Sequence, residues 1–405
     1  MSRYLTALRL AMAVAVSSAA LASRHAAAAV YSISEVMHDL ASPRGLALGP
    51  DGGIYVAEAG SGGSGPSVVL GNGNTAFLGA TSSLSRLLGG VQERVLTDLP
   101  SIATAAGLDA SGLQDVAFDG LGQAYGLFSF GSESSQRDAN LGTAGANLGR
   151  IVRLPLSGGG VEPIADLASH EGLTNPAGGA TDSNPFGVAI ASNGDFLVAD
   201  AGGNSFLKAS PAGAVSTLGV LPARPNPLPF GPPVFQSVPT TIAVGPDGAY
   251  YIGQLTGFPF PPGAANVYRF DPTTNVLSVA HTGFTNIIDL TFDEVGNLFV
   301  LQITTNGLAS ATGPGPGALF KIDGVTGDRT LIASEGLLFP GSVLAGPDGA
   351  LYVSNRTNAP TGGQVLRLTP VPEPSSVGIL WTLLLMGSAS ARRLKTKGTL
   401  QCRRT

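Results

Sequence analysis

One short pattern of apolar and polar residues returns six times along this 405-residue chain. An apolar run leads into a turn that contains glycine, and a second run with alternating apolar and polar character follows. The six copies span residues 45–58, 115–128, 187–200, 241–254, 289–302 and 342–355. Period-two alternation on both sides of a glycine turn is typical of an antiparallel β-hairpin.

Further short strands are predicted after the hairpins. Six third strands share an apolar residue, any residue, a basic residue and then a mostly apolar one, at residues 84–87, 151–154, 206–209, 267–270, 319–322 and 365–368. Fourth strands are predicted at residues 91–97, 161–165, 214–218, 276–280 and 330–333. Four strands in each of six repeats predict an all-β fold, a six-bladed β-propeller over residues 30–370. An open stack of sheets and a β-sandwich are the alternatives.

The sixth repeat has no fourth strand of its own before Pro370. At the other end of the repeats, residues 30–36 form an additional strand that precedes the first hairpin. Pairing this strand with the sixth repeat would close the ring and remove a bare sheet edge. The sequence therefore predicts a propeller closed by its N-terminal strand.

The connections between strands differ strongly in length. The turns inside the hairpins are short and all lie on one face of the propeller. Because this face carries no long loops, we call it the trimmed face. The long insertions all connect second to third strands or one blade to the next, at residues 60–83, 129–147, 169–184, 220–239, 257–265 and 304–317. These connections share the opposite face. Because long loops on a rigid scaffold usually carry binding sites, we expect binding on this loop-bearing face.

Composition excludes some classes of protein. Glycine is frequent, with 57 residues, and glycines recur at matching positions of the repeats, which a disordered chain would not show. The formal net charge is −5. Without a basic stripe in the central region, nucleic acid is not an expected partner. The single cysteine, Cys402, excludes a disulfide framework and a thiol nucleophile in the body of the chain.

Residues 1–29 have the features of a secretory signal peptide. Arg3 and Arg9 provide the positive segment, residues 10–21 provide the apolar segment, and residues 27–29 offer a small-residue cleavage site. Residues 20–22 are the alternative cleavage site. A buried first helix is the alternative interpretation of the segment.

The C-terminal segment 371–395 combines three features in a fixed order. Val371, Pro372, Glu373 and Pro374 come first, an apolar segment at 377–391 follows, and Arg392 and Arg393 come directly after it. The apolar segment is a predicted transmembrane helix, somewhat shorter than the ~20 residues that usually span a bilayer. The basic cluster would lie on the cytoplasmic side.

This order resembles the PEP-CTERM sorting signal of bacteria, although the basic tail 396–405 extends beyond the usual end of such signals. The resemblance implies export, transient anchoring in the inner membrane, and processing by an exosortase. The mature protein would be periplasmic, at the cell surface or extracellular. A plain C-terminal membrane anchor is the alternative.

Polar residues at strand ends are the candidate site residues. We expect Glu58, Asp200 and Asn355 at the inner rim of the loop-bearing face, together with Asp115 or Asp289. Oxygen ligands of this kind suit Ca²⁺, and without cysteine or clustered histidine a zinc site is not expected. Converging carboxylates would also suit general acid–base catalysis. Polar caps hydrogen-bonded to neighbouring backbone are the alternative.

The repeat resembles the NHL-type and SMP-30/gluconolactonase-like propellers, and residues 198–204 match them best. With both terminal signals, the whole mature chain resembles the ScyD/ScyE family, exported propellers associated with cyanobacterial scytonemin biosynthesis. No catalytic residues come with that family. Lactonase-like propellers use acidic and amide metal ligands; Glu58, Asp200 and Asn355 occupy comparable strand ends, but a full set is not matched.

Two functions follow as expectations. The first is a non-catalytic binding or scaffold module at the cell surface or in extracellular matrix, with a glycan, a small metabolite or a protein as ligand. The second is a Ca²⁺-dependent hydrolase or lactonase that uses the inner rim. Convergence of Glu58, Asp115, Asp200 and Asp289 on one cavity would favour the enzyme.

Overall fold

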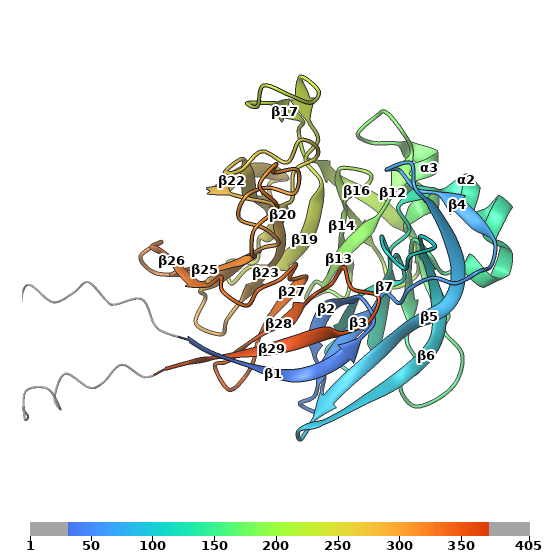
Figure 1. Ribbon diagram of the computed structural model, residues 1–405, viewed down its shortest axis with the longest axis horizontal. Helices are drawn as coiled ribbons and strands as arrows, with labels where there is room; N and C mark the ends of the chain where they lie inside the picture. Colours follow the sequence, from blue (N-terminus) through green and yellow to red (C-terminus); the bar gives the residue numbers. More distant parts are fainter. Residues whose placement is uncertain (1–30, 372–405) are drawn as a thin grey trace, which may run out of the picture. The chain divides into compact units, whose positions relative to one another are not determined.

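Each of the six hairpin repeats forms the first two strands of a four-stranded antiparallel core (Figure 1). The structure is a computed structural model and describes residues 31–371. The signal peptide, the sorting motif after Val371, the apolar segment and the basic tail of the sequence-based predictions lie outside the described residues. Within residues 31–371, no helix is long and apolar enough to cross a membrane.

Five blades are built from consecutive strands, with the hairpin first in each. The first blade contains β2 (Pro43–Leu48), β3 (Ile54–Glu58), β5 (Thr75–Leu88) and β6 (Val91–Ala103). The second contains β7 (Leu113–Phe118), β8 (Ala124–Phe128), β10 (Arg150–Arg153) and β11 (Glu162–Asp166). The third contains β13 (Pro185–Ile190), β14 (Phe196–Asp200), β15 (Ser205–Ala209) and β16 (Val215–Val220). The fourth contains β19 (Pro239–Val244), β20 (Tyr250–Gln254), β21 (Ala265–Asp271) and β22 (Val276–Phe284). The fifth contains β23 (Ile287–Phe292), β24 (Leu298–Gln302), β25 (Ala318–Ile322) and β26 (Arg329–Ala333).

The sixth blade joins the two ends of the propeller. It combines β27 (Ser342–Ala345), β28 (Leu351–Asn355) and β29 (Gly363–Pro370) with β1 (Tyr31–Leu40), in the order β1-β29-β28-β27 (Figure 1). The predicted closure by the N-terminal strand is confirmed, although β1 extends four residues beyond the predicted end at Val36. Met37 and Leu40 of this extension are fully buried, which explains why the strand continues.

The six sheets form a closed ring. The first strand of every blade contacts the first strand of the next, and β27 of the sixth blade contacts β2 of the first. Edge-to-face aromatic pairs fill the spaces between neighbouring sheets, among them Tyr55 with Phe118 and Tyr125 with Phe196. The six-bladed β-propeller is confirmed, and the open stack and the β-sandwich are wrong.

The trimmed face is held by a motif of three side chains that recurs in several blades. In the first blade, Gly52 takes the left-handed conformation that the turn requires (φ 79°). Asp51 Oδ2 accepts hydrogen bonds from Tyr55 OH at 3.0 Å and Arg86 Nη1 at 2.7 Å. The fourth and sixth blades repeat the arrangement through Asp247 and Asp348. These hydrogen bonds hold the hairpin turns of this face to the third strands of their blades.

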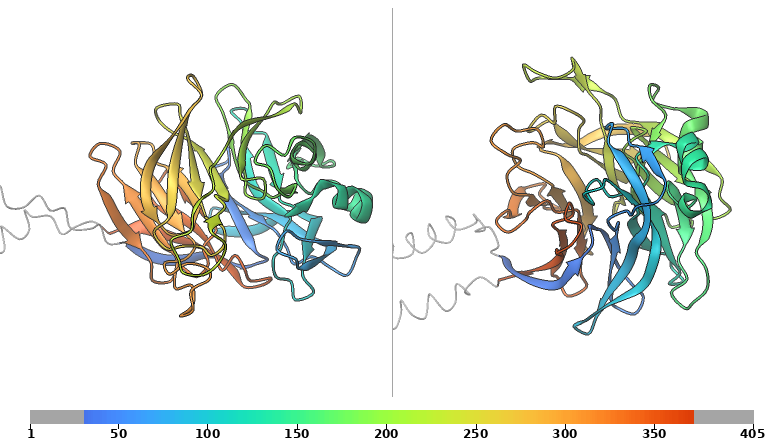
Figure 2. Two further views of the ribbon diagram at one scale, coloured as in Figure 1. Left: turned by 90° about the horizontal axis from the view of Figure 1, so that it is seen from above. Right: turned by 45° about the vertical axis from the view of Figure 1, so that its right-hand side comes forward.

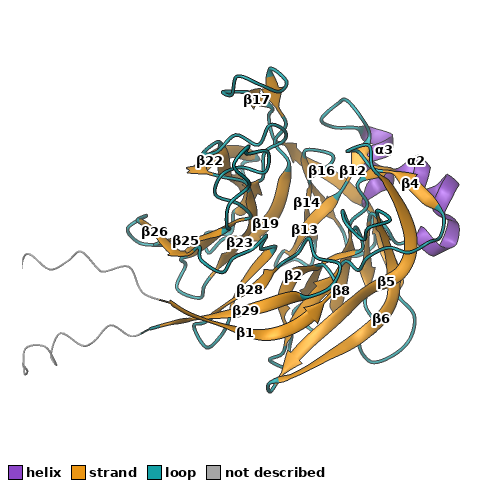
Figure 3. Ribbon diagram, in the orientation of Figure 1, coloured by secondary structure: helices purple, strands orange, loops and turns teal. Residues whose placement is uncertain are grey.

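The loop-bearing face carries the remaining elements (Figures 2 and 3). They are β4 (Ser67–Val69), β9 (Ser132–Glu133), α2 (Ser134–Gln136), the π-helix η1 (Arg137–Leu141), the 3-10 helix η2 (Gly142–Gly145), α3 (Leu167–Thr174), β12 (Asp182–Ser183), β17 (Arg224–Pro225) and β18 (Val234–Phe235). Residues 60–83, predicted as a loop, instead contain β4 and the start of a long β5. Ala76 and Leu78 are buried there, and this burial extends the sheet beyond the blade.

Arg137 fixes the helical insertion to the second blade. Its side chain is fully buried, and its guanidinium donates two parallel hydrogen bonds to Asp166, each 2.9 Å long. Further bonds reach Leu148 O at 2.9 Å and Asp138 Oδ1 at 2.8 Å. Asp166 also caps α3 by accepting from Ser169 N at 3.0 Å. One arginine thus connects η1, η2 and α3.

Candidate functional site

Six aligned residues near the beginning of the first strands surround the axis of the propeller. They are Gly45, Asp115, Gly187, Thr241, Asp289 and Ser342. In the first five blades, the pairing between the first and second strands shifts register just before or at this residue. A β-bulge of this kind re-aims side chains. We call these six residues the axial ring.

Polar members of the axial ring connect several neighbouring blades. Asp115 Oδ2 accepts from the backbone N–H of Val188 at 2.9 Å, and Asp289 Oδ2 accepts from that of Val343 at 2.8 Å. A Cβ on Gly45 would lie 1.9 Å from Asp115 Oδ1, so only glycine leaves room for this carboxylate. The space between the ring residues is about 10 Å³, enough for about one water molecule. The axial ring therefore holds blades together and leaves no room for a substrate.

The two carboxylates of the axial ring differ in their hydrogen bonds. Asp289 accepts from Thr241 Oγ1, Leu290 N, Ser342 Oγ and Val343 N, at 2.6–2.8 Å. For Asp115, two backbone donors are seen, the N–H groups of Val116 and Val188. Desolvation raises the pKa of both groups. The nearby charge of Asp289 adds to this effect and brings the pKa of Asp115 to about 8. Asp115 is therefore the member of the pair that keeps a proton.

We expect the melting temperature of the protein to fall as the pH rises from about 5 to about 8. The raised pKa of Asp115 lets the folded protein hold a proton that the unfolded chain, with a pKa near 3.8, releases. Stability from this group is complete below the unfolded pKa and is lost as the pH rises through the folded pKa. An Asp115→Asn variant should lose part of the dependence. Equal slopes for wild type and variant in melts across this range would contradict the assignment.

Glu58 is another candidate metal ligand, but its carboxylate is fully engaged in contacts with its own blade. The side chain is fully buried. Its carboxylate accepts hydrogen bonds from Ala41 N at 2.6 Å and Ser85 Oγ at 2.5 Å, and forms an ion pair with Arg94 at 3.0 Å. Glu58 therefore ties the strand leading into its blade to the third and fourth strands.

Asp200 and Asn355 have equivalent roles in the third and sixth blades. Asp200 Oδ1 accepts from Asn184 N at 2.7 Å, and its Oδ2 accepts from Ser183 Oγ at 2.7 Å. Asn355 Oδ1 accepts from Leu338 N at 2.7 Å. In each case a strand-end side chain holds the connection that enters its own blade. The alternative of hydrogen-bonded polar caps describes these residues.

The structure does not bring the five candidate metal ligands together. Asp115 and Asp289 share the axial ring, whereas Glu58, Asp200 and Asn355 each bind their own connecting segment. Among residues 31–371, no group of three or more His, Cys, Asp or Glu side chains is placed to hold a metal ion. A Ca²⁺ site built from these residues finds no support in the described geometry.

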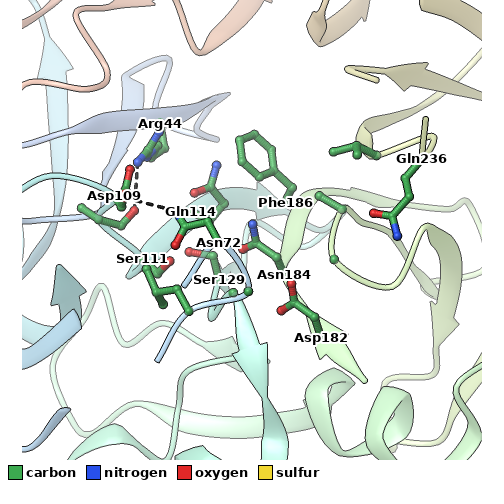
Figure 4. A pocket seen from close by; sticks show the side chains of 17 residues that line it. Arg44, Asn72, Asp109, Ser111, Gln114, Ser129, Asp182, Asn184, Phe186 and Gln236 are labelled. Atoms are coloured by element: carbon green, nitrogen blue, oxygen red, sulfur yellow. Dashed lines mark hydrogen bonds between the residues drawn. The ribbon is translucent and has the colours of Figure 1, made fainter. Parts of the chain in front are cut away.

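The loop-bearing face holds a different site, a pocket of about 360 Å³ (Figure 4). Its volume lies within the range of about 300–1,000 Å³ typical of small-molecule sites. We call it the loop-face pocket. Its lining comes from the connections of the first four blades: Arg44, Leu70, Gly71, Asn72, Asp109, Ala110, Ser111, Gln114, Ser129, Gly131, Asp182, Asn184, Phe186, Ala201, Gly202, Gln236 and Val238.

Three lining residues come from one aligned position. Arg44, Gln114 and Phe186 each directly precede the axial-ring residue of their blade, within the bulge of the first strand. None of the three is among the candidate site residues expected from the sequence. Their common position was a usable signal. Asp109, Asp182 and Asn184 lie in connections that the repeat does not share, so periodicity gave no sign of them.

Several polar atoms of the loop-face pocket have no partner within the described residues. Arg44 Nη2 donates to Ala110 O at 2.9 Å, while its Nε is buried without an acceptor. Asp182 Oδ1 and Asn184 Oδ1 are likewise buried without a donor. Figure 4 shows Arg44 and Asp182 on opposite sides of the pocket, with Phe186 and Asn184 between them.

The charges of the loop-face pocket follow from burial. Desolvation lowers the pKa of Arg44 to about 10, against the opposing effect of the Asp109 charge, so the guanidinium stays protonated at neutral pH. Desolvation, followed by the charges of Asp200 and Glu133, raises the pKa of Asp182 to about 6. At neutral pH the pocket therefore offers a cation at one end and a carboxylate at the other.

Fold and site together define a six-bladed β-propeller with a polar pocket on its loop-bearing face. Among solved structures, a structural-genomics protein of unknown function from Bacteroides thetaiotaomicron is 10% identical, with a TM-score of 0.51, and the match covers 84% of this chain and 76% of its own. A streptogramin B lyase is 15% identical, with a TM-score of 0.44, and the match covers 84% of this chain and 98% of its own. A protein provisionally assigned as a gluconolactonase is 12% identical, with a TM-score of 0.49, and the match covers 84% and 94%.

No protein-family profile matches the chain, and comparison with curated proteins finds no match. At identities of 10–15%, the structural similarities concern the fold alone. The function has to be argued from the loop-face pocket itself.

Proposed function

We propose that this protein is an exported, non-catalytic binding module whose loop-face pocket binds a small polyhydroxylated ligand, such as a saccharide unit of an extracellular glycan. The carboxylates of Asp51, Asp115 and Asp289, on the trimmed face and in the axial ring, accept hydrogen bonds that hold the fold together. The loop-face pocket, in contrast, presents amide, carboxylate and hydroxyl groups around the ring of Phe186. Hydrogen-bonding groups beside an aromatic ring suit the hydroxyls and the apolar face of a sugar.

The observation that carries the proposal is the set of unpartnered polar atoms in this pocket. A buried polar atom without a hydrogen bond costs about 1–3 kcal/mol, so folded proteins rarely retain one without a reason. Arg44 Nε, Asp182 Oδ1 and Asn184 Oδ1 all belong to residues that line the same cavity. A ligand with several hydroxyls would supply donors and acceptors to these atoms.

The hydrolase alternative has less support. It needs carboxylates that share one cavity, yet Glu58 and Asp200 are saturated by their own blades. Asp115 and Asp289 do lie together, but the space beside them holds about one water molecule. The two carboxylates that line the loop-face pocket, Asp109 and Asp182, lie on different sides of it, and Asp109 is held by the amide groups of Asn72 and Asn74. This arrangement favours binding over hydrolysis.

Export and processing are part of the proposal and rest on the terminal sequence motifs. An exosortase would remove the segment after the Pro-Glu-Pro motif at 372–374 and release the propeller to the cell surface or matrix. A role beside exopolysaccharide or secondary-metabolite production fits the same motifs. The mass of the extracellular protein checks this part: a chain that still contains Arg393 would contradict the cleavage.

We expect an Asn184→Ala variant to lose saccharide affinity by about tenfold without losing stability. Asn184 Oδ1 has no partner among the described residues, so its removal takes no protein hydrogen bond away. Its backbone N–H still donates to Asp200. Calorimetric titration with monosaccharides and oligosaccharides measures affinity, and thermal melting measures stability.

Asn193→Ala is the matched control for this experiment. Asn193 lies in a hairpin turn on the trimmed face, where Oδ1 accepts from Asp195 N at 3.1 Å. This variant should keep saccharide affinity and lose a little stability. Equal affinity of wild type and Asn184→Ala for every bound saccharide, or no binding of any saccharide, would overturn the proposal.

A further inference from the structure

We infer that the loop-face pocket selects an anionic saccharide, with Arg44 binding a carboxylate group of the sugar and Asp182 and Asn184 binding its hydroxyls. This inference rests on the proposed function and deepens it. The geometry points to a uronic-acid unit because the pocket separates one cation from a group of hydrogen-bond acceptors (Figure 4). A neutral sugar would leave the guanidinium without a carboxylate in direct contact.

The first step of the argument is the state of Arg44. Within residues 31–371, most arginines form an ion pair with a carboxylate, but no carboxylate oxygen lies within 4.0 Å of the Arg44 guanidinium. One of its nitrogens is committed to Ala110 O, and its buried Nε is unpartnered. A shielded, unpaired charge is costly, and a planar carboxylate is the acceptor that fits a guanidinium best.

The second step concerns Asp109, which lies near Arg44 (Figure 4). Its Oδ2 accepts from the amide groups of Asn72 at 3.2 Å and Asn74 at 2.7 Å. The carboxylate is thereby held in place, and its charge acts on Arg44 without forming a direct ion pair. Asp109 therefore weakens the attraction of Arg44 for an anion. Removing the charge of Asp109 by a single substitution should raise the affinity of the pocket for an anionic sugar.

The third step concerns the opposite end of the pocket. Asp182 and Asn184 each present a buried oxygen without a donor, and hydroxyl groups are donors that both can accept. Asp182 lies across the pocket from Arg44, so its charge does not coincide with the carboxylate position (Figure 4). Phe186 between the two ends offers a flat apolar surface. Together these groups match a sugar with a carboxylate at one end and hydroxyls at the other.

The test is a calorimetric titration of the full chain with D-glucuronate, D-glucose, the methyl ester of glucuronate and a sulfated glucose. D-Glucuronate should bind about 10- to 100-fold more tightly than D-glucose or the ester, because a charge-assisted hydrogen bond is lost with either. The preference should shrink as salt concentration rises. Sulfated glucose binding as tightly as glucuronate would overturn the assignment of a carboxylate.

Two substitutions with opposite effects sharpen the test. Arg44→Gln should remove the preference for glucuronate over glucose, whereas Asp109→Asn should strengthen glucuronate binding severalfold. Asparagine suits position 109, since Asp109 has a positive φ of 54° that asparagine also tolerates. Arg153→Gln, a change in an exposed ion pair, is the control and should alter neither affinity. Melting curves verify that each variant is folded, and Arg44→Met, which also removes the charge, replaces Arg44→Gln if that variant is not.

The outcomes separate the two levels of the proposal. Equal affinities for glucuronate and glucose, or a preference that survives in the folded Arg44 variant, overturn the anionic selectivity and leave saccharide binding intact. Binding of none of the four probes overturns both. A preference lost in Arg44→Gln and strengthened in Asp109→Asn establishes the inference.

Discussion

Replacing Leu40 by alanine is expected to lower the free energy of unfolding by about 2–5 kcal/mol, and replacing Met37 as well should lower it further. Both side chains are fully buried between the sixth and first blades, in a cluster with Val56 of the first blade and Val365 of the sixth. Each truncation leaves a cavity at the seam where the ring closes. A typical domain is stable by only about 5–15 kcal/mol, so the double variant should be close to unfolding at ambient temperature.

Urea unfolding followed by circular dichroism measures this effect. Ile33→Ala is the matched control, because Ile33 belongs to the same strand but is 40% exposed. Its effect should stay below about 1 kcal/mol. If Leu40→Ala and Ile33→Ala were equally mild, β1 would not be the strand that closes the ring.

The second large effect is expected for Arg137→Met, a loss of about 1.5–3 kcal/mol. Methionine keeps the length of the side chain but removes every hydrogen bond that Arg137 donates to Asp166, Asp138 and Leu148. Arg150 still contacts Asp166 at 2.6 Å, so that carboxylate is not left alone. The main loss is the connection between η1, η2 and α3.

Arg153→Met separates this prediction from a general effect of removing an arginine. Arg153 is 46% exposed and forms one ion pair, with Glu162, so its loss should cost about 0–1 kcal/mol. Urea unfolding compares the two variants, and limited proteolysis at residues 134–148 shows whether the insertion opens first. A loss below about 1 kcal/mol for Arg137→Met would contradict the role of the buried arginine.

The propeller could be predicted from the sequence because its information is local and repeated. Each hairpin is recognisable from a turn glycine such as Gly52 and from the alternation of apolar and polar residues on either side of it. Closure by β1 followed from a count, since the sixth repeat lacked one strand. The helical insertion gave no such signal. It depends on Arg137, a single charged residue that belongs to no repeated pattern, so its burial could not be predicted from periodicity.

The candidate site was harder to predict, for a reason that lies in strand geometry. Successive side chains of a strand point to opposite faces of the sheet, so neighbouring strand-end residues face different surroundings. Asp115 and Asp289 point to the axis, whereas Glu58 and Asp200 turn toward their own connecting segments. The sequence-based prediction placed all strand-end residues on one inner rim, although some face the axis and others face the connecting segments. The loop-face pocket lies on connections that differ between blades, and only the position of Arg44, Gln114 and Phe186 is repeated.

The seam in the sixth blade also sets the order in which the protein can fold. β1 is synthesised first, yet its partner β29 is synthesised last, and Ser34 bonds to Arg367 across 333 positions. Contacts so far apart in sequence form slowly, because the intervening chain must be ordered first. Until Pro370 has left the ribosome, β1 has no partner and the ring stays open. A chain of this design therefore cannot complete its propeller until its last strand has been synthesised.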